Sequence, residues 1–179
     1  AINMLNSQAA IIRSISFPKA ILPLSVVLSN TYFMIIGLSV AVVLACVFGP
    51  EYGTWPSWRY VFLPVVIACQ MLFTFGMALA MAASGVLFKD TSNIMGHVVR
   101  MWYFMSPGLY SIDNIPDRYH WLFRLNPFTE LMTAYRDILM FGRVPSLFDL
   151  GYAFFAGLAA CLVGFLIFRG LEGRLVQNL

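Results

Sequence analysis

The sequence predicts an all-α membrane protein, a polytopic bundle of helices, and three observations lead to that prediction. Hydrophobic residues make up 60% of the 179 residues and charged residues only 11%. The mean hydropathy is +0.80, which is typical of membrane chains rather than of soluble domains. Long uncharged runs lie between the charges, and each is long enough for the ~20 helical residues that cross a bilayer.

Four segments are expected to span the membrane, at about 20–49, 60–88, 93–112 and 150–168, and the first two carry no charge. Small residues recur every four positions in three of these segments, a pattern that favours close helix packing. The stripes consist of Ser25, Ser29, Gly37, Ala41 and Ala45, then Gly76, Ala80 and Ser84, and finally Ala156, Ala160 and Gly164. Residues 20–179 are therefore expected to form one transmembrane domain.

Residues 1–19 precede the first span and have two faces. Asn3, Asn6, Ser7, Arg13 and Ser14 fall on one side of a helix, and Ile2, Leu5, Ala9 and Ile12 on the other. Such a segment lies on a membrane surface or docks a partner; the alternative is a loop helix with no specific role. Because the chain opens with Ala1 and lacks a signal-peptide pattern, we expect a fragment without its N-terminal part.

The third expected span carries a polar stripe of Asn93, His97 and Arg100 at i, i+4 and i+7. Polar groups inside a membrane face the bundle interior or water. The alternative is that Arg100 extends to the nearer membrane surface. His97 is a poor candidate for a metal ligand, since the other histidine, His120, lies beyond the break at Ser106-Pro107-Gly108, and no metal site is expected.

Two short helices, about 117–125 and 127–141, are expected between the third and last spans. Asn126 is a good N-cap, Pro127 suits the first helical position, Glu130 lies in the first turn and Gly142 is placed to end the helix. Both helices are too short to cross a bilayer. Broken backbone at membrane depth persists only inside protein or beside water, so we expect re-entrant helices that close a pathway.

The residue types on the two short helices are compatible with more than one role. The first presents Tyr119, Trp121 and Phe123, whose rings either anchor a helix at the interface or stack on sugars. The second has an apolar face and a polar face. The apolar face consists of Leu131, Met132, Tyr135, Ile138 and Leu139, and the polar face of Glu130, Thr133, Arg136 and Asp137.

Familiar catalytic chemistry is missing from the sequence. Lys19 and Lys89 follow Pro18 and Phe88, so the ending of a phosphate-binding loop is absent. There is no HExxH, paired-cysteine motif or nucleophile elbow, and no Lys/Arg cluster of the kind that binds nucleic acid. The eight carboxylates lie outside the uncharged parts of the spans, unlike those of ion-coupled carriers. We therefore expect no catalytic residue and no bound cofactor, and either a passive pore or one driven by a partner.

A series of short motifs is similar to a known family. The motifs are Phe17-Pro18-Lys19-Ala20-Ile21-Leu22-Pro23-Leu24, Phe88-Lys89-Asp90, Ser106-Pro107 with Tyr110, Leu125-Asn126-Pro127-Phe128-Thr129, and Tyr135-Arg136-Asp137 with Phe141-Gly142. In this order and spacing the chain resembles the membrane (permease) subunit of bacterial ATP-binding-cassette (ABC) exporters of polysaccharides and polyol phosphates. O-antigen and teichoic-acid exporters belong to that family. Lys89 stands where an arginine is common, which keeps the charge.

The resemblance implies an architecture and a set of partners. It implies six spans per subunit, a homodimer that encloses the conduit in the bacterial cytoplasmic (inner) membrane, and an ABC ATPase subunit that binds ATP and Mg. The cargo would be a lipid-linked glycan or polyol-phosphate polymer. Basic residues near the span ends divide six against five, a weak preference for cytoplasmic termini and an external gate.

The resemblance also implies roles for individual residues. Contacts with the ATPase would involve Asn6, Ser7, Arg13, Ser14, Phe17, Lys89 and Asp90. The conduit would be lined by Asn93, His97, Arg100, Trp102, Tyr103, Phe104 and Tyr110. The gate helices would contribute Trp121, Asn126, Pro127, Glu130, Arg136 and Asp137.

Three other functions are compatible with part of this pattern. The nearest is an ABC exporter of drugs or lipids with the same architecture. A partner-free channel would also lack nucleotide-binding motifs. A purely structural scaffold fits poorly with the polar stripe that begins at Asn93.

Overall fold

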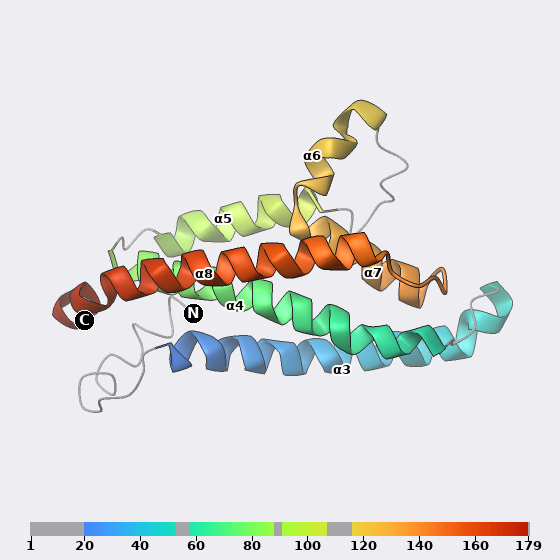
Figure 1. Cartoon of the computed structure of the whole chain (residues 1–179). Coiled ribbons are helices and arrows are strands. Elements are labelled where there is room, and N and C mark those ends of the chain that lie inside the picture. The colour runs from blue at the N-terminus through green and yellow to red at the C-terminus, as the bar shows by residue number, and fades with distance from the viewer. Residues whose placement is uncertain (1–19, 53–57, 88–90, 107–115, 179) are drawn as a thin grey trace.

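The computed structural model describes residues 20–52, 58–87, 91–106 and 116–178, and this part of the chain is helical without any strand. The order is α3 (Ile21–Tyr52), η1 (Trp58–Phe62), α4 (Leu63–Leu87), α5 (Thr91–Phe104), η3 (Asp117–Tyr119), α6 (His120–Arg124), α7 (Pro127–Leu139) and α8 (Leu147–Asn178). The long helices run side by side as a bundle (Figure 1). The predicted all-α membrane bundle is therefore confirmed.

Among the described residues, three helical segments are long and apolar enough to cross a membrane: Ile21–Gly49, Trp58–Gly85 and Leu147–Gly170. They coincide with the first, second and last expected spans. The last candidate span ends at Gly170, close to the expected residue 168, and α8 continues beyond it as a single helix to Asn178.

The third expected span is shorter than predicted. Helix α5 has 14 residues and ends at Phe104, so at ~1.5 Å per residue it is about 21 Å long. The helix ends before the expected limit at residue 112 because the chain bends at Ser106, and residues 107–112 of the expected span lie outside the described residues. Ser106 precedes Pro107, and a residue before proline is disfavoured in the α conformation.

Helices α4 and α8 form the most extensive helix pair of the described structure. A Cβ placed on Gly76 would overlap the backbone of Ala160 and Cys161, and one on Gly164 would overlap the carbonyl oxygen of Gly76. These two small-residue stripes therefore pack as predicted. On α3, by contrast, a Cβ placed on Gly37 would have nothing within 4 Å among the described residues.

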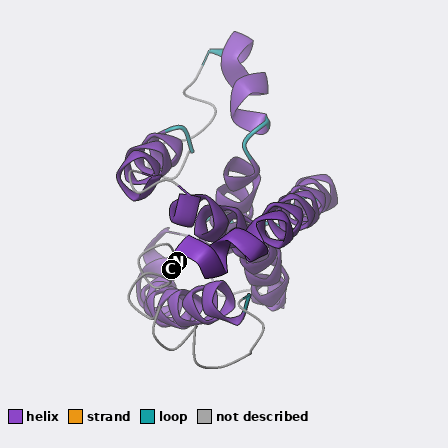
Figure 2. Cartoon of the chain, turned by 90° about the vertical axis from the view of Figure 1, so that its left-hand side faces the viewer, coloured by secondary structure: helices purple, strands orange, loops and turns teal. Residues whose placement is uncertain are grey.

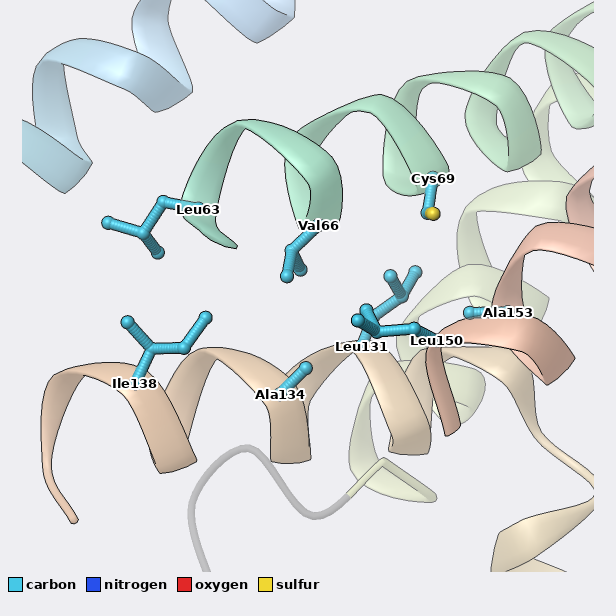
Figure 3. Packing of buried hydrophobic residues seen from close by; sticks show 8 residues of the cluster. All are labelled: Leu63, Val66, Cys69, Leu131, Ala134, Ile138, Leu150 and Ala153. Atoms are coloured by element: carbon cyan, nitrogen blue, oxygen red, sulfur yellow. The ribbon is translucent and has the colours of Figure 1, made fainter. Parts of the chain in front are cut away.

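Helix α7 packs its apolar face onto the α4–α8 pair. Leu131, Ala134 and Ile138 of α7 are fully buried, and the cluster is completed by Leu63, Val66, Cys69, Leu150 and Ala153 (Figure 3). The short helix is thus a built-in part of the bundle, while α6 stands away from it in both views (Figures 1 and 2).

Candidate functional site

The start of α7 is tied to the end of α5 through Asn126. Its backbone is extended (φ −87°, ψ 113°) and its Oδ1 accepts hydrogen bonds from the Phe128 N–H at 3.0 Å and from Trp102 Nε1 at 2.6 Å. Its Nδ2 donates to Ser106 Oγ at 3.5 Å. The expected N-cap is confirmed. We call Trp102, Ser106 and Asn126 the neck, because their hydrogen bonds join the end of α5 to the start of α7.

Three aromatic rings pack beside the neck. The rings of Phe73, Trp102 and Phe128 meet edge to face, with centroids 5.3 Å apart for the two phenylalanines and 6.2 Å for each pair with Trp102. Such geometry adds about 0.5–1.5 kcal/mol per pair beyond area burial. Trp102 therefore joins α4, α5 and α7, a contact that its assignment to the conduit did not anticipate.

The end of α7 has a different anchor. The N–H groups of Met140 and Phe141 both donate to the carbonyl oxygen of Arg136, and Gly142 follows with φ +55°. That left-handed conformation favours glycine, and it confirms the predicted helix end. The Arg59 guanidinium of η1 donates a hydrogen bond to the Gly142 carbonyl oxygen, so a residue far away in the sequence fixes this end of α7.

The middle of α7 is bonded to α4. The Tyr135 hydroxyl donates to Gln70 Oε1 at 2.8 Å, and burial raises the pKa of Tyr135 above its ordinary value, so the hydroxyl keeps its proton. The prediction that Tyr135 belongs to the apolar face of its helix did not include this hydrogen bond. The sequence did contain a signal for this contact. Gln70 carries a polar amide within a hydrophobic span, and such a group needs a hydrogen-bond partner.

The polar face of α7 lies against acidic and basic neighbours. Burial raises the pKa of Glu130 from 4.5 to about 7; the nearby Asp149 adds to the increase, and Arg124 opposes it. Burial also raises the pKa of Asp137, with Arg143 acting in the opposite direction. Two carboxylates of one short helix are therefore held where their charged form is disfavoured.

Helix α5 presents a different set of side chains. His97, Arg100, Tyr103 and Phe104 are exposed in the described structure. Tyr103 also borders an apolar groove of about 650 Å³ between α3, α4, α5 and α7, which the aromatic rings of Phe73, Trp102 and Phe128 help to line. Of the predicted conduit residues whose side chains are described, Trp102 and Tyr103 border the groove, and His97, Arg100 and Phe104 lie on exposed parts of α5.

The remaining predicted site residues fall into two groups. Trp121 of α6 is 62% exposed, and Pro127 takes the first position of α7. The predicted ATPase contacts, Asn6, Ser7, Arg13, Ser14, Phe17, Lys89 and Asp90, lie outside the described residues, as do Tyr110 and the side chain of Asn93. Their roles stay predictions.

Comparison with known proteins gives a consistent result. The model of the ABC-2 type transporter family matches residues 11–140. The chain is 33% identical to an O-antigen export system permease protein RfbA of Myxococcus xanthus over 143 residues, which cover 79% of this chain and 54% of that protein. It is 28% and 26% identical to two such proteins of Klebsiella pneumoniae, each over 97% of this chain and 65% of the relative.

The chain therefore spans between about half and two thirds of the length of these curated relatives. The family match covers well over half of the chain and includes α3, α4, α5, the neck and α7. The chain belongs to the ABC-2 type transporter family.

Proposed function

We propose that the chain is part of the permease subunit of an ATP-driven ABC exporter that moves a lipid-linked polysaccharide or polyol-phosphate polymer across the bacterial cytoplasmic membrane. The observation that carries this proposal is the similarity to O-antigen export permeases over 97% of the chain. Three helices of spanning length and a separate, packed short helix support the same conclusion.

The proposed assembly is supported by the resemblance to ABC exporter permeases. Two copies of the permease enclose the conduit, six spans each, and an ABC ATPase sits under each copy. ATP and Mg bind to that partner, and this chain has no enzymatic activity of its own. The segment at 1–19 and the Phe88-Lys89-Asp90 turn transmit ATPase motion to the spans.

We assign exposed residues of α5 to the conduit and helices α6 and α7 to the gate. The exposed face of α5, with Tyr103 and Phe104, lines the conduit, because aromatic faces stack on sugar rings without needing charge. The polar stripe of His97 and Arg100 faces water in the same space. Helices α6 and α7 lie at the external mouth.

The alternatives predict different results. A drug or lipid exporter would show ATP hydrolysis stimulated by small hydrophobic compounds and not by glycan. A partner-free channel would purify from native membranes without an ATPase. Co-purification followed by ATPase assays of the reconstituted complex distinguishes both from polymer export.

Deletion of the gene in its native host is the most direct test. Undecorated lipid-linked polymer should accumulate inside the cell, and a plasmid copy should restore the polymer to the surface. If surface polymer is unchanged and no intermediate accumulates, the proposed cargo is wrong.

The ATPase contact has its own test. Arg13→Glu should weaken association with the ATPase and abolish export while the permease still accumulates in the membrane. Arg174→Glu, which places the same charge change near the C-terminal end of α8, serves as the matched control. Normal assembly and export by Arg13→Glu would remove the basis for assigning residues 1–19 to coupling.

A further inference from the structure

Arg59 stands at the beginning of the second span. The span runs from Trp58 to Gly85, so Arg59 lies at one boundary of its apolar region. The neighbouring Trp58 is 67% exposed, and tryptophan at the end of a span is typical of the membrane–water interface. The Arg59 guanidinium is therefore expected near the depth of the lipid headgroups.

The end of α7 meets Arg59 at this boundary. In the buried cluster Leu63, which follows η1, lies opposite Ile138 of α7 (Figure 3), and the start of α4 and the end of α7 lie at the same end of the bundle (Figure 1). The Arg59 guanidinium donates a hydrogen bond to the Gly142 carbonyl oxygen just beyond α7. This bond holds the side chain of Arg59 close to α7 instead of leaving it to extend into water.

The positive charge of Arg59 is incompletely compensated. A guanidinium carries five N–H donors and stays charged. The bond to Gly142 goes to a neutral carbonyl, and Nε of Arg59 is buried without a hydrogen-bond partner among the described residues. A buried donor without a partner and a charge without a counter-charge are both unfavourable. Arg59 as a whole is half-buried, which leaves it open to an anion from outside the bundle.

A second arginine adjoins the same peptide group. Arg143 directly follows Gly142 and is exposed, and its guanidinium carbon lies 5.5 Å from the centroid of the Phe141 ring. The carbonyl that accepts the bond from Arg59 belongs to the peptide group that leads into Arg143. Two basic residues are therefore brought together at the end of α7, and we call Arg59 and Arg143 the arginine pair.

The carboxylate of Asp137 offsets this pair only in part. Burial raises the pKa of Asp137; Arg143 opposes the increase, Asp149 adds to it and Arg136 opposes it. Because the charged form of Asp137 is disfavoured, it balances Arg143 incompletely. Arg59 is not among the charges that act on Asp137, so this carboxylate does not supply its counter-charge.

The phosphate group of a phospholipid matches the arginine pair in charge and in depth. Arginine binds phosphate through charge-assisted and often bidentate hydrogen bonds, and basic sites at the ends of spans bind lipid headgroups. We propose that the arginine pair binds the phosphate group of an anionic phospholipid and that this lipid stabilises the end of α7 at the membrane surface. The inference goes beyond the proposed transport function and does not depend on which polymer is exported.

Native mass spectrometry tests the site in the complete permease with its ATPase, purified in detergent, stripped of lipid and titrated with phosphatidylglycerol. Each wild-type permease should bind one phosphatidylglycerol more tightly than further molecules. Arg59→Gln should weaken that binding about tenfold, as expected when a charge-assisted hydrogen bond is lost. Arg118→Gln removes the same charge from an exposed residue of η3 and should leave the affinity unchanged.

Arg143→Gln provides a second variant at the site. Because Arg143 is exposed, its substitution leaves the packing of α7 intact, and it should weaken phosphatidylglycerol binding severalfold even if Arg59→Gln fails to fold. If both variants, or Arg143→Gln where Arg59→Gln cannot be purified, bind phosphatidylglycerol like the wild type, the proposal is wrong.

Two other phosphate compounds identify the occupant. Phosphatidylcholine should bind more weakly than phosphatidylglycerol, because its choline cation is repelled by the arginine pair; equal affinity would contradict the proposal. Inorganic phosphate at the same concentration should not displace phosphatidylglycerol. If it does, the site takes a soluble phosphate, and the assignment to a lipid is overturned.

Glu51 offers a further check on the charge of Arg59. It precedes Arg59 in the turn between the first two spans, and its side chain lies outside the described residues. Glu51→Gln should leave phosphatidylglycerol binding unchanged. Tighter binding in this variant would show that Glu51 already balances Arg59, which would remove the basis of the site.

Hydrogen exchange tests the stabilising effect of the bound lipid. Phosphatidylglycerol should slow the exchange of amides 137–141 in the wild type and in Arg118→Gln, but not in Arg59→Gln or Arg143→Gln. Equal exchange with and without the lipid in the wild type would contradict a role for the lipid in holding the end of α7.

Discussion

Gly76 of α4 and Gly164 of α8 lie backbone against backbone, so close that a Cβ on either would overlap the other helix. Gly157 continues the same contact about two turns earlier on α8, where a Cβ would lie 3.1 Å from the Phe73 backbone nitrogen. This contact brings the two helices together along one line, and the pair forms the surface on which α7 packs.

Substitution at this contact should separate the two helices. Gly164→Ala is expected to destabilise the protein by about 1–3 kcal/mol, as overpacking usually does. Gly151→Ala lies on the same helix, in open space, and should be neutral or slightly stabilising because alanine favours helix. Thermal unfolding of the two variants in the same detergent gives the comparison, and equal midpoints would mean that the contact can relax.

The hydrogen bond between Trp102 and Asn126 should contribute measurably to stability. Trp102→Phe keeps an aromatic ring near Phe73 and Phe128 but removes the N–H donor, and we expect a loss of about 0.5–1.5 kcal/mol. Tyr103→Phe, one position further along α5, is the control. In a double-mutant cycle with Asn126→Ala the two losses should not add; additive losses would indicate independent roles.

Stability should depend on pH through Glu130. Its pKa is raised in the folded protein from 4.5 to about 7, so between these values the folded state binds a proton that the unfolded state has released. The stabilisation is fully present below about pH 4.5 and is lost as the pH rises through 7. Screening at this half-buried site limits the effect to the order of 1–2 kcal/mol.

The measurement is thermal unfolding between pH 4 and 8. Glu130→Gln should flatten the dependence over this range, because its amide does not titrate. Glu172→Gln, near the C-terminal end of α8, keeps Glu130 and should retain the slope. A slope that persists in Glu130→Gln would assign the dependence to another group.

The end of α7 should be sensitive to the residue at position 142. Gly142 has φ +55°, where a side chain costs about 1–2 kcal/mol, so Gly142→Ala should destabilise by that amount. Gly170→Ala, in open space on α8, is the control. The expected signature is faster hydrogen exchange of amides 137–141, and unchanged protection there would show that the bond from Arg59 alone holds this end.

Export should depend on aromatic rings on the exposed face of α5. Tyr103→Ala and Phe104→Ala are expected to reduce surface polymer several-fold without reducing the amount of permease, since each removes a flat face for stacking. Phe155→Ala removes an equally exposed ring from α8 and should export normally. A similar loss in all three variants would point to a general effect of ring removal rather than to a conduit.

Much of this architecture follows from the sequence because its causes are local. Uncharged runs of spanning length predict α3, α4 and α8 from composition alone. Asn126, Pro127 and Gly142 predict both ends of α7, since caps depend on neighbouring backbone groups. The motif at Ser106-Pro107 indicated the break after α5, although the expected span still ran too far.

The tertiary structure alone decided which of these elements hold together. Similar small-residue stripes occur on α3, α4 and α8, yet only the last two meet through Gly76 and Gly164. Arg59 reaches Gly142 across 83 positions and Tyr135 reaches Gln70 across 65. A sequence pattern indicates that a buried polar group needs a hydrogen-bond partner or that a small residue favours close packing. Many residues of the chain could be that partner. Only the packing of the whole chain selects one, and here it fixes α7 to the bundle and leaves α6 outside it.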